Sequence, residues 1–164
     1  MQTVHVFDIA TNTWFAQPTT AEWQHYPTGL SEFCSVEASA EDGSSHNIYI
    51  YGGWSQSEGF GRYEIFVLTL PYFHWVRVYP APEDTGNLDF RRLYKHRCEK
   101  IHKKHMVAYR GNNYNYTCDG DKGMKKLQGM TIYDMSSLNW TTNVELENQK
   151  YSVPQVLYEI IGGK

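Results

Sequence analysis

The chain has 164 residues, a formal net charge of −3 and an aromatic content of 15%. The slightly acidic balance argues against a general nucleic-acid-binding surface. No apolar run reaches the 18 residues that a membrane-spanning helix needs, and Met1 is followed at once by a strand pattern instead of a signal peptide. The many aromatic residues suit half-buried strands.

The first expected strands lie in V-H-V-F-D-I-A-T-N-T-W, residues 4–14, where an apolar strand leads through a polar turn to a tryptophan. The same order returns at residues 65–75 and 130–140. In every copy the turn residue precedes the tryptophan by six positions; the turn residues are Asp8, Thr69 and Asp134, and the tryptophans are Trp14, Trp75 and Trp140. Such a period, built from strands and turns, predicts a repeat array.

A second motif ends in glycine and fills the gaps between the tryptophan motifs. It reads H-N-I-Y-I-Y-G-G at residues 46–53, H-M-V-A-Y-R-G at 105–111, and Y-E-I-I-G-G at 158–163. Paired glycines at a strand end permit positive φ and close backbone approach. In the second copy Arg110 replaces the first glycine. The structural repeat positions are therefore Gly52, Gly53, Gly111, Gly162 and Gly163.

At these motifs the chain resembles the kelch repeat, in which one repeat forms one four-stranded blade of a β-propeller. It is most similar to fungal kelch-repeat cell-surface proteins with a galactose oxidase central domain-like propeller, on the segments F-C-S-V-E-A-S, S-S-H-N-I-Y-I-Y-G-G, L-T-L-P-Y-F-H-W and V-P-Q-V-L-Y-E-I-I-G-G. The resemblance implies an all-β, kelch-type propeller. Near-continuous apolar strands agree with it, because blades are covered on both faces.

The blades can be assigned along the chain. Residues 1–20 give the end of a blade, 21–80 and 88–145 give one full blade each, and 151–164 give the start or closing strand of another. Residues 145–151 favour a loop. Propellers close with typically four to eight blades, so we expect an incomplete propeller, the C-terminal piece of a longer protein. The fungal relatives commonly carry a secretion signal and a membrane span, which implies an extracellular or cell-surface location through a membrane-anchored parent.

A basic stretch covers residues 95–105, with five Lys or Arg and one Glu. It could bind phosphate or an anionic polymer, but a solvated strand edge protected by lysines is the favoured interpretation. In the same stretch His102 and His105, with His96 or Cys98, could be drawn as metal ligands. The surrounding cations would repel a divalent ion, so neither a metal site nor a cofactor is expected.

Three cysteines require a pairing. Cys34 and Cys98 lie near the start of the first strand of successive blades, and Cys118 follows the glycine-containing strand in the blade of Cys98. The first two strands of a blade are antiparallel, so Cys98 and Cys118 can approach, whereas a bridge between blades is less able to meet the Cα separation of about 7 Å or less. We predict a Cys98–Cys118 disulfide, with Cys34 a buried thiol or the partner of a missing segment.

Two tripeptides, at Asn115 and Asn139, match the N-glycosylation pattern. They are candidate glycosylation sites if the parent protein is secreted.

The function predicted is a non-catalytic interaction scaffold. Kelch-type propellers include copper radical oxidases resembling galactose oxidase, but no tyrosine and histidine pair here stands in a recognisable ligand context. We therefore expect no enzyme activity, and a carbohydrate-binding propeller is the main alternative. Two loops, residues 54–62 and 112–126, are long enough to bind, and the first carries the candidate binding residues Trp54, Phe60 and Arg62. A plain connection, with Trp54 against a neighbouring blade, is its simpler interpretation. The expected partner is an unidentified protein or cell-wall carbohydrate, not nucleic acid.

Overall fold

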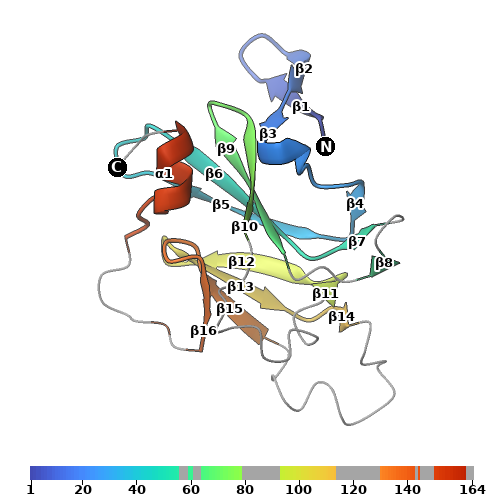
Figure 1. Ribbon diagram of the computed structural model, residues 1–164, viewed down its shortest axis with the longest axis vertical. Helices are drawn as coiled ribbons and strands as arrows, with labels where there is room; N and C mark the ends of the chain where they lie inside the picture. Colours follow the sequence, from blue (N-terminus) through green and yellow to red (C-terminus); the bar gives the residue numbers. More distant parts are fainter. Residues whose placement is uncertain are drawn as a thin grey trace.

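Two antiparallel four-stranded sheets dominate the computed structural model, which describes residues 1–55, 59–60, 64–78, 93–113, 130–142, 144 and 150–161 (Figure 1). The first sheet contains β5 (Cys34–Ser39), β6 (His46–Tyr51), β9 (Ile65–Leu70) and β10 (His74–Val78). The second contains β12 (Arg97–Ile101), β13 (His105–Tyr109), β15 (Met130–Asp134) and β16 (Asn139–Thr141). Strands adjacent in each series are hydrogen-bonded neighbours, so each sheet is a meander. The prediction of an all-β chain is confirmed.

The N-terminal residues form a separate hairpin of β1 (Thr3–Asp8) and β2 (Thr13–Pro18), which lies at one end of the molecule (Figure 1). The chain then reaches β3 (Thr20–Ala21), which pairs in parallel with β10 at the outer edge of the first sheet. The remaining short elements are the 3-10 helix η1 (Glu22–Gln24) and the strands β4 (Leu30–Ser31), β7 (Trp54–Ser55), β8 (Gly59–Phe60), β11 (Leu93–Tyr94) and β14 (Asn112–Asn113).

The polar turn before each tryptophan has a recurring geometry. Asp8 Oδ1 accepts a hydrogen bond from the amide of Ala10 at 2.9 Å, and Asp134 Oδ1 accepts one from the amide of Ser136 at 2.8 Å. A carboxylate that bonds the backbone two residues on is a typical turn-forming device. In the middle copy Thr69 lacks this carboxylate, and its hydroxyl instead donates to the carbonyl of His74 at 3.1 Å. The turn therefore survives the change from aspartate to threonine.

The backbone conformation repeats as well. The residue two positions before each tryptophan has positive φ, with values of 53° at Asn12, 53° at Phe73 and 58° at Leu138. The three copies thus share one turn shape in spite of three different side chains.

Apolar side chains join the hairpin, the first sheet and the second sheet in that order. One cluster fills the space between the two sheets and includes Tyr49, Val67, Met106 and Tyr133. A second cluster covers the opposite face of the first sheet, where Phe66 and Trp75 pack near Met1 and Val4 of the N-terminal segment. The first sheet is thus covered on both faces, as stacked blades require.

The tail corrects one expectation, because residues 155–161 form a helix and not the start or closing strand of a blade. Helix α1 (Gln155–Ile161) begins after Pro154, whose carbonyl accepts bonds from the amides of Leu157 and Tyr158, both at 2.9 Å. Leu157 and Ile161 are buried, and Ile160 packs against the same cluster. This spacing of three and four residues is a helical stripe. None of the described helices has the length and apolar character needed to cross a bilayer.

Candidate functional site

The three repeated tryptophans lie at matching register positions but differ in exposure. Trp14 faces Phe7 across β1 and β2, Trp75 faces Leu68 across β9 and β10, and Trp140 faces Tyr133 across β15 and β16. Each partner directly precedes its turn residue in the sequence. The three tryptophan-bearing faces are therefore equivalent surfaces of three successive units.

In the two sheets this face is covered by the preceding unit. Trp75 is only 2% exposed and its indole Nε1 donates to the carbonyl of Met1 at 3.1 Å. Trp140 lies against Tyr51 of the first sheet, with ring centroids 4.9 Å apart. In both sheets the tryptophan face thus points towards the unit that comes earlier in the chain.

On the hairpin the corresponding face is open. Trp14 is 66% exposed and Phe7 is 40% exposed, and their rings are 5.0 Å apart (centroid to centroid). On the opposite face Val4 and Val6 are half-buried, and Val4 packs against the cluster of the first sheet, whereas Phe15 is 50% exposed. We call the surface formed by Phe7 and Trp14 the open tryptophan face. None of the described elements covers it.

The structure corrects the expected disulfide pairing. Cys98 is bonded to Cys34, and their Cα atoms are 5.5 Å apart, whereas Cys118 lies outside the described residues. The first strands β5 and β12 of the two sheets lie side by side (Figure 1), so a bridge between sheets is within reach. The two cysteines are also offset from each other by one residue in the register of their strands.

Cys34 pairs with Tyr51, which precedes Gly52, while the residue paired with the equivalent Tyr109 is Arg97. Cys98 therefore stands one position further along its strand than Cys34. A shift of one residue moves a side chain to the other face of a sheet. The two sulfurs consequently face each other across the gap between the sheets, which truly equivalent positions could not do.

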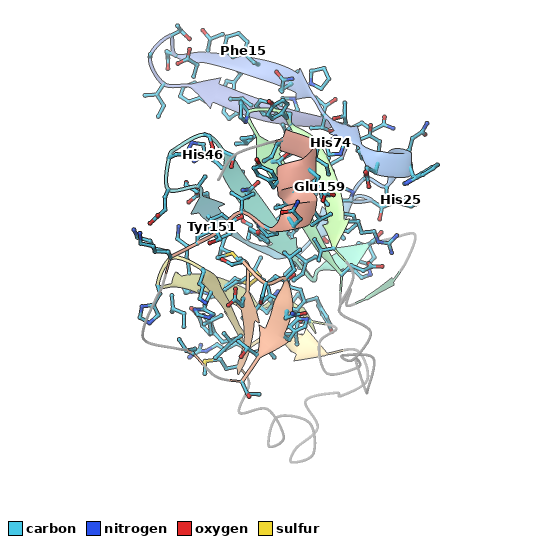
Figure 2. All side chains as sticks on the ribbon, turned by 60° about the vertical axis from the view of Figure 1, so that its left-hand side comes forward. Phe15, His25, His46, His74, Tyr151 and Glu159 are labelled. Carbon is cyan, nitrogen blue, oxygen red and sulfur yellow. A yellow bond between two sulfur atoms is a disulfide. The ribbon has the colours of Figure 1, made fainter. Side chains whose placement is uncertain are left out.

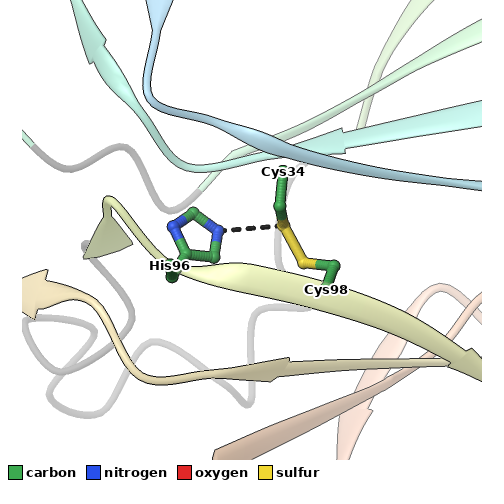
Figure 3. Close-up of a disulfide and its surroundings, with 3 residues drawn as sticks. All are labelled: Cys34, His96 and Cys98. Carbon is green, nitrogen blue, oxygen red and sulfur yellow. Dashed lines mark hydrogen bonds between the residues drawn. A yellow bond between two sulfur atoms is a disulfide. The ribbon is translucent and has the colours of Figure 1, made fainter.

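His96 completes this junction. Its Nε2 lies 3.0 Å from Cys34 Sγ, and Figure 3 shows the ring directed at that sulfur. His96 is 6% exposed, and burial lowers its pKa to about 4, against a smaller opposing effect of a backbone hydrogen bond with Tyr51. The ring is therefore neutral near pH 7. His102 is exposed at the far end of β12, roughly 20 Å of strand away, and His105 lies 3.6 Å from Asp134.

Gly52 makes room for this imidazole, and Gly111 makes room for the Cα and Cβ atoms of the same residue. A Cβ on Gly52 would lie 2.6 Å from His96 Cε1, and one on Gly111 would lie 2.6 Å from His96 Cβ. Gly53 and Gly111 have similar φ values, 97° and 90°. Arg110 adopts a φ of 61° where Gly52 has 67°, so the turn keeps its conformation although a glycine is missing.

The basic stretch is largely paired with acidic side chains. Lys95 lies 3.5 Å from Glu32 and Lys100 lies 3.1 Å from Glu37, so both lysines reach residues of the first half of the chain. Lys104 lies 3.1 Å from Asp134. These ion pairs reduce the free positive charge available for an anionic ligand.

The other candidate residues are not gathered at one place. Trp54 is half-buried in β7, where it pairs with Ser31 and with the backbone of Phe60, while Arg62 lies outside the described residues. Asn139 is exposed at the start of β16, and Asn115, Gly162 and Gly163 lie outside the described part of the chain. The glycosylation sites and the binding loop stay predictions.

A relative supports the repeat family. The chain is 26% identical over 187 aligned residues to a Kelch repeat-containing protein of Arthroderma benhamiae, an alignment that covers 99% of this chain and 26% of that protein. The chain thus spans about a quarter of that relative's length. No protein-family model matches. Together with the two meandering sheets, the match shows an all-β, kelch-type fold and supports placing the chain among kelch-repeat proteins.

Proposed function

We propose that this chain is a non-catalytic interaction scaffold that binds a protein partner through the open tryptophan face. The observation that carries the proposal is the exposure of Trp14, whose two repeat equivalents are packed against a neighbouring unit. Aromatic residues are enriched at the centre of protein interfaces. An exposed tryptophan beside an exposed phenylalanine is thus a suitable anchor.

The chemistry of the partner follows from the buried equivalents. Trp140 is covered by an apolar sheet face that includes Tyr51, and Trp75 lies beside apolar residues of the N-terminal segment. The partner we infer presents a similar apolar sheet face, as a blade does. A blade of a longer parent protein and a blade of a second copy both meet this description, and a cell-surface parent is the setting we propose.

The test is the association state of the full chain by light scattering and sedimentation velocity. We expect the wild type to self-associate, because the open face pairs with sheet faces of other copies. Trp14→Lys should lower the weight-average molar mass. Trp23→Lys should not, because Trp23 is 87% exposed but lies in η1 and not on the open tryptophan face. A monodisperse wild-type monomer, or an equal effect of both substitutions, would refute the proposal.

Carbohydrate binding is the second candidate, and exposed aromatic residues outside the repeated face favour it. Trp23 and Tyr72 are both exposed and could stack on sugar rings. Sedimentation of the chain with insoluble β-glucan or chitin tests this role. Binding that is lost in Trp23→Ala and kept in Trp14→Lys would favour carbohydrate over a protein partner.

A further inference from the structure

The junction of the two sheets brings together three side chains that are good ligands for a soft divalent metal ion. Cys34 comes from β5, Cys98 from β12, and His96 from the residue before β12. Their ligand atoms all lie within 4.8 Å of one another. Figure 3 shows the imidazole and both sulfurs converging between the two first strands.

The imidazole is already held in the orientation that a ligand needs. Gly52 leaves space for the ring, which packs in an edge-to-face arrangement with Tyr51, with centroids 5.0 Å apart. A neutral imidazole carries one proton and one lone pair, so Nε2 can donate to a disulfide sulfur in one state or offer its lone pair to a metal in another.

We propose that reduction of the Cys34–Cys98 disulfide converts this junction into a Cys₂His site for Zn²⁺, in which Cys34, Cys98 and His96 are three of the four ligands. Two thiolates and an imidazole are typical ligands for this ion, which prefers four-coordinate tetrahedral sites. The inference is independent of the partner that covers the open tryptophan face.

The conversion balances in two steps. A dithiol reductant supplies two electrons and two protons, the sulfur–sulfur bond breaks, and the reductant becomes a cyclic disulfide. Zn²⁺ then displaces the proton of each thiol, so that two protons are released for each ion bound. The two states exclude each other, because a disulfide sulfur has no thiolate to offer.

A simpler role for His96 makes a different prediction. If the ring only fills the space between the two sheets, its nitrogen atoms are irrelevant to metal affinity, and the reduced chain binds divalent ions weakly with either histidine changed. The arrangement of the nitrogen within 3.0 Å of one cysteine sulfur favours the ligand role.

Co²⁺ is a suitable probe because thiolate ligands give it visible absorption, and Zn²⁺ should displace it. The experiment uses the full chain with Cys118→Ser, which removes the third thiol, in three forms: unchanged at the junction, His96→Gln, and His102→Gln as the matched control. We expect the reduced chain to bind one Co²⁺, the oxidised chain to bind none, and His102→Gln to behave as the parent. Loss of an outer-shell partner alone costs about 10–100-fold in metal affinity, so His96→Gln should lower affinity at least tenfold.

Circular dichroism on the same samples shows whether the chain unfolds when the disulfide is reduced. If reduction lowers the strand signal, Zn²⁺ should restore it in the parent and in His102→Gln but not in His96→Gln. Absence of Co²⁺ binding by the reduced chain, or equal affinity of the two histidine variants, would overturn the proposal.

Discussion

Substitution of Gly52 by alanine should be among the most damaging single changes in this chain. The added Cβ would lie 2.4 Å from the carbonyl oxygen of Leu93 and 2.6 Å from His96 Cε1, at a backbone φ of 67°. That carbonyl cannot easily move, because it accepts a hydrogen bond from the amide of Gly53 at 2.8 Å. Positive φ costs a non-glycine residue about 1–2 kcal/mol, and overpacking costs about 1–3 kcal/mol more.

A control glycine separates the two effects. Gly43 has nearly the same φ of 70°, but a Cβ there would meet nothing within 4 Å. Gly43→Ala should therefore lower the free energy of unfolding by about 1–2 kcal/mol, and Gly52→Ala by about 2–5 kcal/mol. Urea unfolding followed by circular dichroism, at one chain concentration, measures both. Equal losses at the two positions would refute the idea that close packing between the sheets requires Gly52.

The other predictions concern the same junction and the helix beside it. Removal of the disulfide in a Cys34→Ala, Cys98→Ala double variant opens a loop with a sequence separation of 64, and we expect a loss of about 4 kcal/mol in the free energy of unfolding; an unchanged urea midpoint would contradict the bridge. Because burial holds the pKa of His96 at about 4, below its usual 6.5, its contribution to stability is complete above pH 6.5 and falls by up to about 1.4 kcal/mol per pH unit between 6.5 and 4. His96→Gln should flatten this part of the pH profile, and His102→Gln should leave it unchanged. Tyr151→Phe should cost about 1–3 kcal/mol in urea unfolding, because Tyr49 and Asn47 both bond its hydroxyl, at 2.9 and 3.1 Å; a neutral result would show that this buried network adds nothing.

The repeated turns could be predicted from sequence because their signals are local. The offset of six residues between turn residue and tryptophan sets the hairpin register, and the structure pairs Trp14, Trp75 and Trp140 with the residues that directly precede those turns. Even the missing aspartate at Thr69 and the missing glycine at Arg110 left the turns in place, since a hydroxyl and a positive φ at arginine substitute for them.

The disulfide could not be predicted in the same way, because it depends on the relative position of two sheets. Treating Cys34 and Cys98 as equivalent concealed their offset by one residue. Counting along the sequence does not reveal the offset, because Cys34 lies 19 residues before Gly53 and Arg97 only 14 residues before Gly111. The strand register alone aligns Cys34 with Arg97. Two stacked units meet through opposite faces, so that a bridge between them requires an odd offset.

The prediction of a strand in the C-terminal segment was wrong because its glycine pair fits the end of either a strand or a helix. Two glycines after Ile161 fit the end of a strand in this repeat, but glycine is also common directly after a helix. The spacing of Leu157, Ile160 and Ile161 favours the helix, and the structure has it (Figure 1).

The C-terminal tail covers apolar and polar groups at the junction of the two sheets, whereas the N-terminal hairpin leaves its aromatic side chains exposed. Tyr151, before the helix, lies where the two sheets meet (Figure 2) and bonds to Tyr49, whose hydroxyl also donates to the carbonyl of Met135 at 2.9 Å. The tail therefore seals the junction between the two sheets with buried polar contacts as well as apolar ones. The hairpin, in contrast, exposes Phe15 on one face (Figure 2) and Trp14 on the other. Since Trp75 and Trp140 are covered where a unit precedes them, the exposure of Trp14 reflects the position of the hairpin in the described stack and not a different local fold.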